Sequence, residues 1–212
     1  MRFTRIAAVA TAAVAASALT AAPASAHTKT LKTKSLAAVL TADKSGFDRN
    51  GYDYDILTAA VQAVLKAKPA SKVAVLADGK VALTAFLPND LAFRRLVADI
   101  QHTKRLPGEK AAFTAVAGLG INTVESVLLY HVVPGATITK KAAVNANGVA
   151  LTTAQGGTFT VRVYNRYLPI VELRDQDPND VNPFLNPRAL DINAGNRQIA
   201  HGIVFVLRPL DL

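Results

Sequence analysis

The 212-residue sequence has no cysteine, no tryptophan and a single methionine. The absence of cysteine excludes disulfide bonds, thiolate metal sites and a lipid attached through an N-terminal cysteine. A domain without such crosslinks must be stabilised by its hydrophobic core, and this chain is long enough to bury one. We therefore expect a core-stabilised domain rather than a small crosslinked scaffold.

The first 26 residues have the pattern of a secretory signal peptide. Arg2 and Arg5 supply a positive start, and an apolar, alanine-rich run follows over residues 6–19. An Ala-Ser-Ala motif ending at Ala26 provides the small residues that signal peptidase needs. The apolar run is shorter than the roughly 20 residues of a membrane-spanning helix, and no second long run follows. We expect cleavage after Ala26 and a secreted, extracellular chain that associates with the cell wall.

Basic residues outnumber acidic ones, giving the full chain a net charge of +9. Loss of Arg2 and Arg5 with the signal segment lowers this charge to +7. Such a charge favours anionic neighbours, among which we expect a cell-wall polymer, a polysaccharide or an extracellular protein. A solvated basic surface that only keeps the chain soluble remains an equal alternative. The basic residues are scattered and tryptophan is absent, so we expect no nucleic-acid partner.

The mature chain is expected to hold a flexible lead-in over residues 27–46 and a single domain over 47–212. Apolar residues at helical spacing predict helices after Asp55, after Asn89 or Asp90, over 109–117 and before Pro134. Strands are predicted from apolar runs and alternation, at Val73–Leu76, Val81–Leu87, Thr158–Tyr164, Leu168–Leu173, Ala189–Ile192 and Ile203–Leu207. This mixed order favours an α+β fold over a doubly wound sheet.

Polar side chains just before the apolar runs are candidate helix caps. Asp55 is placed to accept hydrogen bonds from the free amides of the helix that follows it, and Asn89 or Asp90 from those of the next. Asn122 and Glu125 have the spacing of a capping box. The Arg174–Arg188 segment contains prolines and aspartates without apolar periodicity, which predicts a long surface loop.

No motif in the sequence points to a metal, a cofactor or catalysis. The segment Asp175–Asp180 has clustered oxygen ligands for Ca²⁺ but lacks the glycine and glutamate of a calcium loop, so a solvated loop is favoured. The acids of Asp48–Asp55 are explained by capping and turn formation. Neither a nucleophile elbow, a phosphate loop nor a dinucleotide fingerprint occurs. The histidines lack the spacing of a zinc site: His27, His102, His131 and His201.

Three segments, taken in order, resemble the signature of the fasciclin domain family. They are Leu83–Phe93, with its proline, polar cap and Ala-Phe; Val127–Gly135, with its Tyr-His pair; and the closing strand His201–Leu207. The resemblance covers roughly Tyr52 to Leu210. It implies a wedge of β-sheet packed with a cluster of helices, and an extracellular adhesion or matrix-binding module without catalysis.

The closing strand departs from the family pattern. His201 replaces the usual asparagine, Phe205 stands in place of a histidine and Arg208 in place of an aspartate. The loop over 174–188 is also longer than is usual in the family. Any role that the family attaches to this strand is therefore not carried over to this chain.

The resemblance makes Tyr130 and His131 candidate binding residues, because this region has been linked to receptor contacts in animal members. Asn89 and Asp90, in the polar cap of the first segment, complete the candidate set. The alternative for Tyr130 and His131 is structural, with rings in the core and polar atoms bonded to the backbone. His131 could act as a general base only with an orienting acid and a nucleophile, and no local motif supplies them.

The leading hypothesis is a secreted, non-catalytic binding or adhesion module that contacts cell-wall, matrix or polysaccharide components. Two alternatives stay open from the sequence. One is a secreted hydrolase acting on polysaccharide or ester, which needs His131 in a cleft near a carboxylate. The other is a wall-associated structural protein whose contacts are non-specific and are lost at moderate salt.

Overall fold

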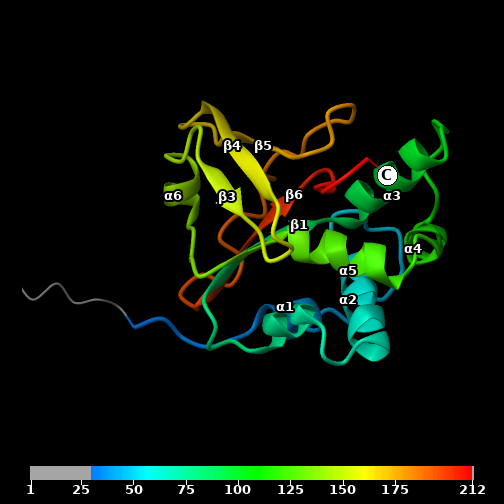
Figure 1. The fold of residues 1–212 in the computed structure, drawn as a ribbon, viewed down its shortest axis with the longest axis horizontal. Coiled ribbons are helices and arrows are strands. Elements are labelled where there is room, and N and C mark those ends of the chain that lie inside the picture. The colour runs from blue at the N-terminus through cyan, green and yellow to red at the C-terminus, as the bar shows by residue number, and fades with distance from the viewer. Residues whose placement is uncertain (1–29, 212) are drawn as a thin grey trace, which may run out of the picture. The chain divides into compact units, whose positions relative to one another are not determined.

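A computed structural model describes residues 30–211 (Figure 1). The predicted signal segment, residues 1–26, lies outside the described residues. The helices are α1 (Leu36–Leu40), α2 (Asp55–Ala67), the 3-10 helix η1 (Lys72–Ala77), α3 (Asp90–Ile100), α4 (Glu109–Gly118), α5 (Ile121–Tyr130) and α6 (Lys140–Ala143). The strands are β1 (Leu83–Pro88), β2 (Val132–Pro134), β3 (Ala150–Thr152), β4 (Thr158–Asn165), β5 (Ile170–Arg174) and β6 (Gln198–Ile203).

The strands form two three-stranded sheets, one ordered β2-β1-β6 and the other β3-β4-β5. β1 is antiparallel to β2 and parallel to β6, whereas β4 is antiparallel to both of its neighbours. Figure 1 shows the second sheet on one side of β1 and helices α2 to α5 on the other. This mixture of helices and small sheets confirms the predicted α+β class.

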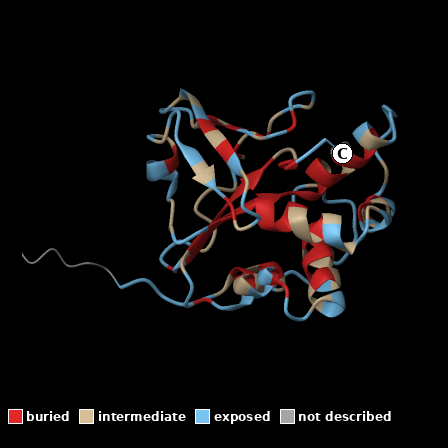
Figure 2. Cartoon of the chain, viewed as in Figure 1, coloured by how far each residue is buried: buried red, intermediate tan, exposed pale blue. Residues whose placement is uncertain are grey.

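Strand β1 is buried along its whole length and separates two hydrophobic cores. Because successive side chains of a strand point to opposite faces, Leu83, Ala85 and Leu87 join the core formed with the helices. Phe86 joins the second core, formed with β4 and β5. Figure 2 shows this buried region where the strands meet α5 and α2. Both faces of β1 therefore carry apolar side chains, as in the interior strand of a larger sheet.

Residues 31–40 are packed into the fold, which corrects the prediction of a flexible lead-in over 27–46 for this stretch; residues 27–29 lie outside the described residues. Leu36 and Leu40 of α1 are 0% and 5% exposed and belong to the helical core. The backbone of this segment lies directly against Gly79, where an added Cβ would be 1.8 Å from the Thr33 carbonyl oxygen. The compact unit begins at Leu31 because these leucines complete a core that residues 47–212 leave open.

A buried glutamine fastens α1 to the rest of the domain. Gln198 of β6 is 0% exposed, and its Oε1 accepts a hydrogen bond of 2.8 Å from the Leu36 amide. Its Nε2 donates to the carbonyl oxygens of Val75 and Asp78, both at 2.8 Å. All polar capacity of this amide is used on backbone groups, as burial requires. Gln198 thereby ties α1 and η1 to the central sheet.

Helix α2 is capped by a residue distant in sequence, not by Asp55 as predicted. The carboxylate of Asp90 accepts hydrogen bonds from the Ile56 amide at 2.9 Å and from the Asp55 amide at 3.2 Å. Tyr54, at the N-cap position, makes no capping hydrogen bond through its side chain. The free amides of α2 are thus satisfied across a sequence separation of 35 residues.

The capping box predicted from Asn122 and Glu125 is wrong. Helix α5 begins at Ile121, two residues before the start that a cap at Asn122 implies, and its N-cap residue is Gly120, which has no side chain to form a cap. The Glu125 carboxylate instead pairs with Lys68 and accepts from the Ser71 hydroxyl. Glu125 therefore forms a tertiary ion pair with Lys68 in place of the local capping contact.

Two strand predictions fail and one shifts along the chain. The run 73–76 is a turn of 3-10 helix, since a short apolar run alone does not distinguish a strand from a helical turn. The run 189–192 forms no strand, although Ile192 exchanges two backbone hydrogen bonds with Ala200. The strand predicted at 203–207 lies earlier, as β6. By contrast, β4 confirms the predicted alternating strand, with its odd-numbered side chains facing the core.

Helices α4 and α5 meet at a sharp bend of 106°. The bend follows Gly118 and uses Gly120, whose φ of +89° lies in the region that favours glycine. This confirms the predicted helix over 109–117 and its glycine stop. Within residues 30–211 no single helix has both the length and the hydropathy to cross a membrane; α4 and α5 meet that test only when joined.

Replacing Leu36 by alanine tests whether α1 belongs to the core. Because this side chain is fully buried, the substitution is expected to lower the free energy of unfolding by about 2–5 kcal/mol. Urea denaturation followed by circular dichroism measures this change. The matched control is Leu31→Ala, at a residue that is 37% exposed, which should change stability far less. Equal, small effects of both substitutions would restore the idea of a flexible lead-in.

Candidate functional site

Tyr130, the first candidate binding residue, lies in the second hydrophobic core. Its side chain is 0% exposed, and its hydroxyl donates a hydrogen bond of 2.7 Å to the Thr158 carbonyl oxygen. Its ring packs edge-on against Phe159, with ring centroids 6.1 Å apart. Burial raises the pKa of Tyr130 above its ordinary value, so the hydroxyl stays protonated. Tyr130 therefore joins the end of α5 to β4.

His131, the second candidate, joins the end of α5 to the segment after β6. Its Nδ1 lies 2.7 Å from the Val127 carbonyl oxygen, and its Nε2 accepts a hydrogen bond of 3.0 Å from the Leu207 amide. This pair of contacts requires the neutral tautomer protonated on Nδ1. Burial lowers the pKa of His131 to about 4. The imidazole is a neutral connector whose two nitrogens both face backbone atoms.

Asn89 and Asp90, the remaining candidates, are also buried, at 2% and 0% exposed. The Asn89 side chain accepts a hydrogen bond of 2.9 Å from the Ala92 amide, which confirms its predicted role as the cap of α3. Asp90 caps α2, as described above, and burial raises its pKa to about 8. Both side chains are occupied by helix amides.

The four candidate residues therefore lie inside the domain and offer no side chain to a partner in this conformation. Their contacts agree with the structural role that the sequence left open for Tyr130 and His131. A binding surface has to be sought among exposed groups.

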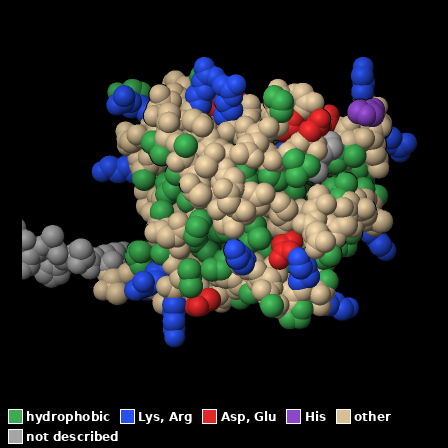
Figure 3. Space-filling view, in the orientation of Figure 1, with side chains coloured by type: hydrophobic (Ala, Val, Ile, Leu, Met, Phe, Trp, Pro, Cys, Tyr) green, Lys and Arg blue, Asp and Glu red, His purple; other side chains and the backbone are tan. Residues whose placement is uncertain are grey.

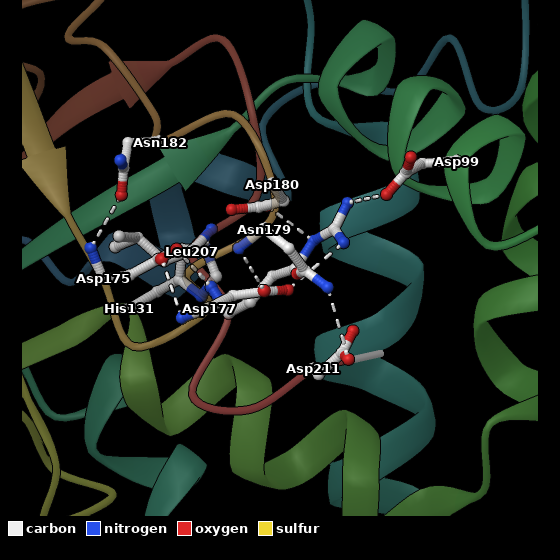
Figure 4. A network of polar contacts seen from close by, with 10 residues as sticks. Asp99, His131, Asp175, Asp177, Asn179, Asp180, Asn182, Leu207 and Asp211 are labelled. Carbon is white, nitrogen blue, oxygen red and sulfur yellow. Dashed lines mark hydrogen bonds and ion pairs between the residues drawn. The ribbon is translucent and has the colours of Figure 1, made fainter.

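Arg208 forms a buried ion-pair network that the sequence did not predict (Figure 4). Its Nη2 lies 2.7 Å from Asp99, its Nε 2.8 Å from Asp180 and its Nη1 3.4 Å from Asp177. The backbone amide of Arg208 also donates to the Asp175 carboxylate at 2.7 Å. The side chain of Arg208 is 8% exposed. One arginine thus fixes the first half of the loop over 174–188.

This network corrects the picture of a fully solvated loop, because Asp177 is only 2% exposed. The carboxylates of Asp177 and Asp180 pair with the Arg208 guanidinium, and that of Asp175 accepts from the Arg208 amide. Burial raises the pKa of Asp175 to about 7 and that of Asp180 to about 6, although Arg208 opposes the second shift. The sequence held a signal for this network: Arg208 stands where the family has an aspartate, and the loop over 174–188 is rich in aspartates.

The β4–β5 hairpin presents the most exposed aromatic and apolar side chains of its sheet. Tyr167 is 89% exposed, Leu168 68%, Tyr164 55% and Ile170 44%. The turn is held by Asn165, whose Oδ1 accepts from the amides of Tyr167 at 2.8 Å and Leu168 at 3.0 Å. We call Arg162, Tyr164, Arg166, Tyr167, Leu168 and Ile170 the hairpin surface.

Tyr164 is held in place by its neighbours on the outer face of the sheet. Its hydroxyl donates to Glu172 at 3.0 Å, and its ring stacks on Phe184 with centroids 6.3 Å apart. The Arg162 guanidinium lies 5.2 Å from the ring centroid, within cation–π range. An aromatic side chain fixed in this way loses little conformational entropy on binding.

The hairpin surface is basic as well as aromatic. Arg162, Arg166 and Arg174 are exposed around it, against the single carboxylate of Glu172. Figure 3 shows Lys and Arg side chains standing out from the part of the molecule where Figure 1 places β4 and β5. Arginine matches carboxylate groups in a two-pronged geometry, and aromatic faces supply apolar contact area. This surface is suited to an anionic, partly apolar partner.

Replacing Arg208 by methionine is expected to destabilise the domain strongly. The side chains of Asp177 and Asp180 are 0% and 5% exposed, so their charges would lose their partner in a buried place. A loss of about 3–5 kcal/mol in the free energy of unfolding follows. Urea denaturation measures it, with the exposed Arg188→Met as the control. A loss no greater than that of the control would contradict the network's role.

Replacing His131 by glutamine tests its neutral state. In the unfolded chain the His131 imidazole has its ordinary pKa of 6.5 and binds a proton below that pH, whereas in the folded chain it stays neutral down to about pH 4. His131 therefore contributes stability that is lost as the pH falls through this window. The stability advantage of the wild type over His131→Gln should shrink by up to ~3 kcal/mol between pH 7 and pH 4. Urea denaturation at each pH measures it; a constant difference would refute the assignment.

Comparison with known proteins bears on the fold and the family. A search of curated proteins found no match. Among solved structures, a FAS1 domain pair from the insect cell adhesion molecule fasciclin I is similar, with a TM-score of 0.55 and 16% sequence identity. The match covers 84% of this chain and 51% of that one, so this chain spans about half of its length. At this identity the likeness shows the fold alone.

The family model of the fasciclin domain matches residues 55–207, which is more than half of the chain. The matched range includes all three segments on which the resemblance was based. Fasciclin domains are adhesion-type modules. The chain belongs to the fasciclin domain family.

Proposed function

We propose that this chain is a secreted, non-catalytic binding module that attaches to anionic polysaccharide of the cell wall or extracellular matrix through its hairpin surface. The observation that carries the proposal is the exposed combination of Tyr167 and Leu168 with the arginines of β4 and β5. Membership in a family of adhesion-type modules supports it. The predicted signal peptide supports a location outside the cell.

Charge complementarity favours an anionic partner. The chain without its predicted signal segment carries a net charge of +7, so a polyanion is attracted over the whole surface. On the hairpin surface, Arg162 and Arg166 offer donors that fit carboxylates. The ring of Tyr164 contacts Arg162, and its hydroxyl donates to Glu172. Long-range attraction would bring the polymer to the domain, and the hairpin would hold it.

A binding role is favoured over hydrolysis by the position of the histidines. A hydrolase using His131 requires a cleft and a nearby carboxylate, whereas both nitrogens of this ring contact backbone atoms in the core. The buried His201 likewise places Nε2 2.8 Å from the Ile138 carbonyl oxygen. Neither imidazole is placed to transfer a proton to a bound substrate in this conformation.

Loss of the hairpin surface is expected to reduce binding to an acidic polysaccharide. The double variant Tyr167→Ala/Leu168→Ala removes exposed area without touching the core, so the domain should keep its fold. Retention on immobilised polygalacturonate at 0.15 M salt should fall about tenfold or more, since central aromatic contacts each contribute about 1–3 kcal/mol. Arg166→Gln should weaken binding less and reduce its salt dependence.

Matched controls separate this surface from general charge. Tyr52→Ala removes another exposed tyrosine, 70% exposed, and Arg105→Gln another exposed arginine. Both should bind nearly as well as the wild type. If all variants bind alike and binding disappears at moderate salt, the non-specific structural alternative is favoured instead. If none of the proteins is retained, the proposed partner is wrong.

A further inference from the structure

Five carboxylates meet where three helices begin. Asp55, Asp90 and Glu109 are the first residues of α2, α3 and α4, respectively. Asp48 and Asp53 come from the turn that precedes α2. The cluster lies apart from the hairpin surface in the sequence and uses none of its residues.

The oxygen atoms of this cluster have the spacing of cation ligands. One oxygen each from Asp48, Asp55 and Glu109 lie within 4.8 Å of one another, and the same is true of Asp53, Asp55 and Asp90. Ca²⁺ binds oxygen at about 2.3–2.6 Å, so two ligands on opposite sides of the ion are about 5 Å apart. A single ion can therefore contact all three oxygens of either group.

Helix capping accounts for Asp90 but not for the rest of the cluster. Both Asp90 oxygens accept hydrogen bonds from amides of α2. Glu109 is 3% exposed; its Oε2 accepts from the Asp48 amide at 2.6 Å, whereas its Oε1 has no hydrogen-bond partner among the described residues. Asp55 is 9% exposed, and its Oδ2 has no hydrogen-bond partner within residues 30–211. Two buried carboxylate oxygens thus point to a missing positive partner.

The electrostatics of the cluster are unfavourable without a cation. The grouped carboxylates of Asp48, Asp55 and Glu109, and those of Asp53, Asp55 and Asp90, bring like charges within 4.8 Å of one another, so they repel when ionised. Arg94 is a cation that acts on Glu109 and offsets part of this repulsion. The three helix ends contribute only about half a positive charge each, too little to balance this number of acids.

The ligand chemistry favours calcium over other metals. The two groups contain only carboxylates, the hard oxygen donors that Ca²⁺ prefers, with neither imidazole nor thiolate. Ca²⁺ also accepts varied coordination geometries, whereas Mg²⁺ demands a near-ideal octahedron at about 2.0–2.1 Å. A surface hollow of about 300 Å³, lined by Asp43, Lys44 and Asp55 among others, gives an ion and its waters access.

We propose that Asp48, Asp55 and Glu109 bind one Ca²⁺ ion, with Asp53 and solvent water as further ligands. The ion would join the turn before α2 to the first residues of α2 and α4. The sequence assigned the acids of Asp48–Asp55 to capping and turns, because the fourth carboxylate comes from Glu109, 61 residues after Asp48. Only the folded chain brings it to the turn.

Isothermal titration of the folded protein, residues 27–212, with CaCl₂ tests the site directly. We expect one Ca²⁺ per chain with a Kd of about 10⁻⁴–10⁻³ M, the range of extracellular calcium modules. At a tenfold excess over Kd the melting temperature should rise by about 3–6 °C relative to EDTA. Terbium offers an independent probe, since Tyr52 and Tyr54 lie in the same turn and should sensitise its emission.

Variants locate the ion. Glu109→Gln and Asp55→Asn keep the side-chain shape and remove one charge, so both should lose the calcium-dependent rise and at least tenfold in affinity. In EDTA, Glu109→Gln should melt no lower than the wild type, because it relieves repulsion among buried acids. Asp78→Asn, at an exposed acid outside the cluster, should respond to calcium like the wild type.

Several results would overturn the proposal. Absence of heat and of any melting shift up to 10 mM CaCl₂ would remove the site. An unchanged response in Glu109→Gln and Asp55→Asn would place the ion elsewhere. An equal response to MgCl₂ would remove the assignment to calcium. Neither the hairpin variants nor the polysaccharide assay enters these measurements, so this site and the proposed function fail or survive separately.

Discussion

Strand β1 must satisfy two hydrophobic cores at once, because its side chains alternate between its faces. Leu83, Ala85 and Leu87 face the helices, while Phe86 packs edge-on against Phe159 of the other sheet, with centroids 5.2 Å apart. β2 and β6 hold this strand in register from both sides. This six-residue strand therefore contacts both other strands of its sheet and helix α3, and its side chains enter both hydrophobic cores.

Buried polar side chains perform the crosslinking that a cysteine-free domain cannot obtain from disulfides. Gln198 ties α1 and η1 to β6, His131 ties α5 to the chain after β6, and Arg208 ties the long loop to α3. Each joins elements distant in sequence. The partners of Gln198 and His131 are backbone groups in the interior, and Arg208 pairs with the buried Asp177 and Asp180 as well as with the more exposed Asp99, so loss of one of these side chains leaves buried polar groups without a partner. These contacts favour one arrangement of the elements over other compact ones.

The buried contacts separate structural side chains from those that remain available to a partner. Residues fixed by two or three buried contacts are not free to recognise a partner, so the binding surface that we propose consists of exposed side chains on a rigid support. The β4–β5 hairpin has that character, since Phe159 and Leu173 anchor its inner face while Tyr167 extends into solvent. The acidic cluster lies at a different place, where the first residues of three helices bring carboxylates together and leave one oxygen each of Asp55 and Glu109 without a hydrogen-bond partner among the described residues.

The sequence alone determined the family, the α+β class and the elements with strong local signals, such as α4 with its glycine stop and the alternating strand β4. It also predicted that Asn89 or Asp90 caps α3, because such a contact is local, and the structure shows that Asn89 does so across three residues. The tertiary structure decided what depends on distant partners: the cap of α2, the packing of α1 and the burial of Tyr130 and His131. Local patterns report periodicity and propensity, whereas burial and charge pairing depend on which segments meet in space.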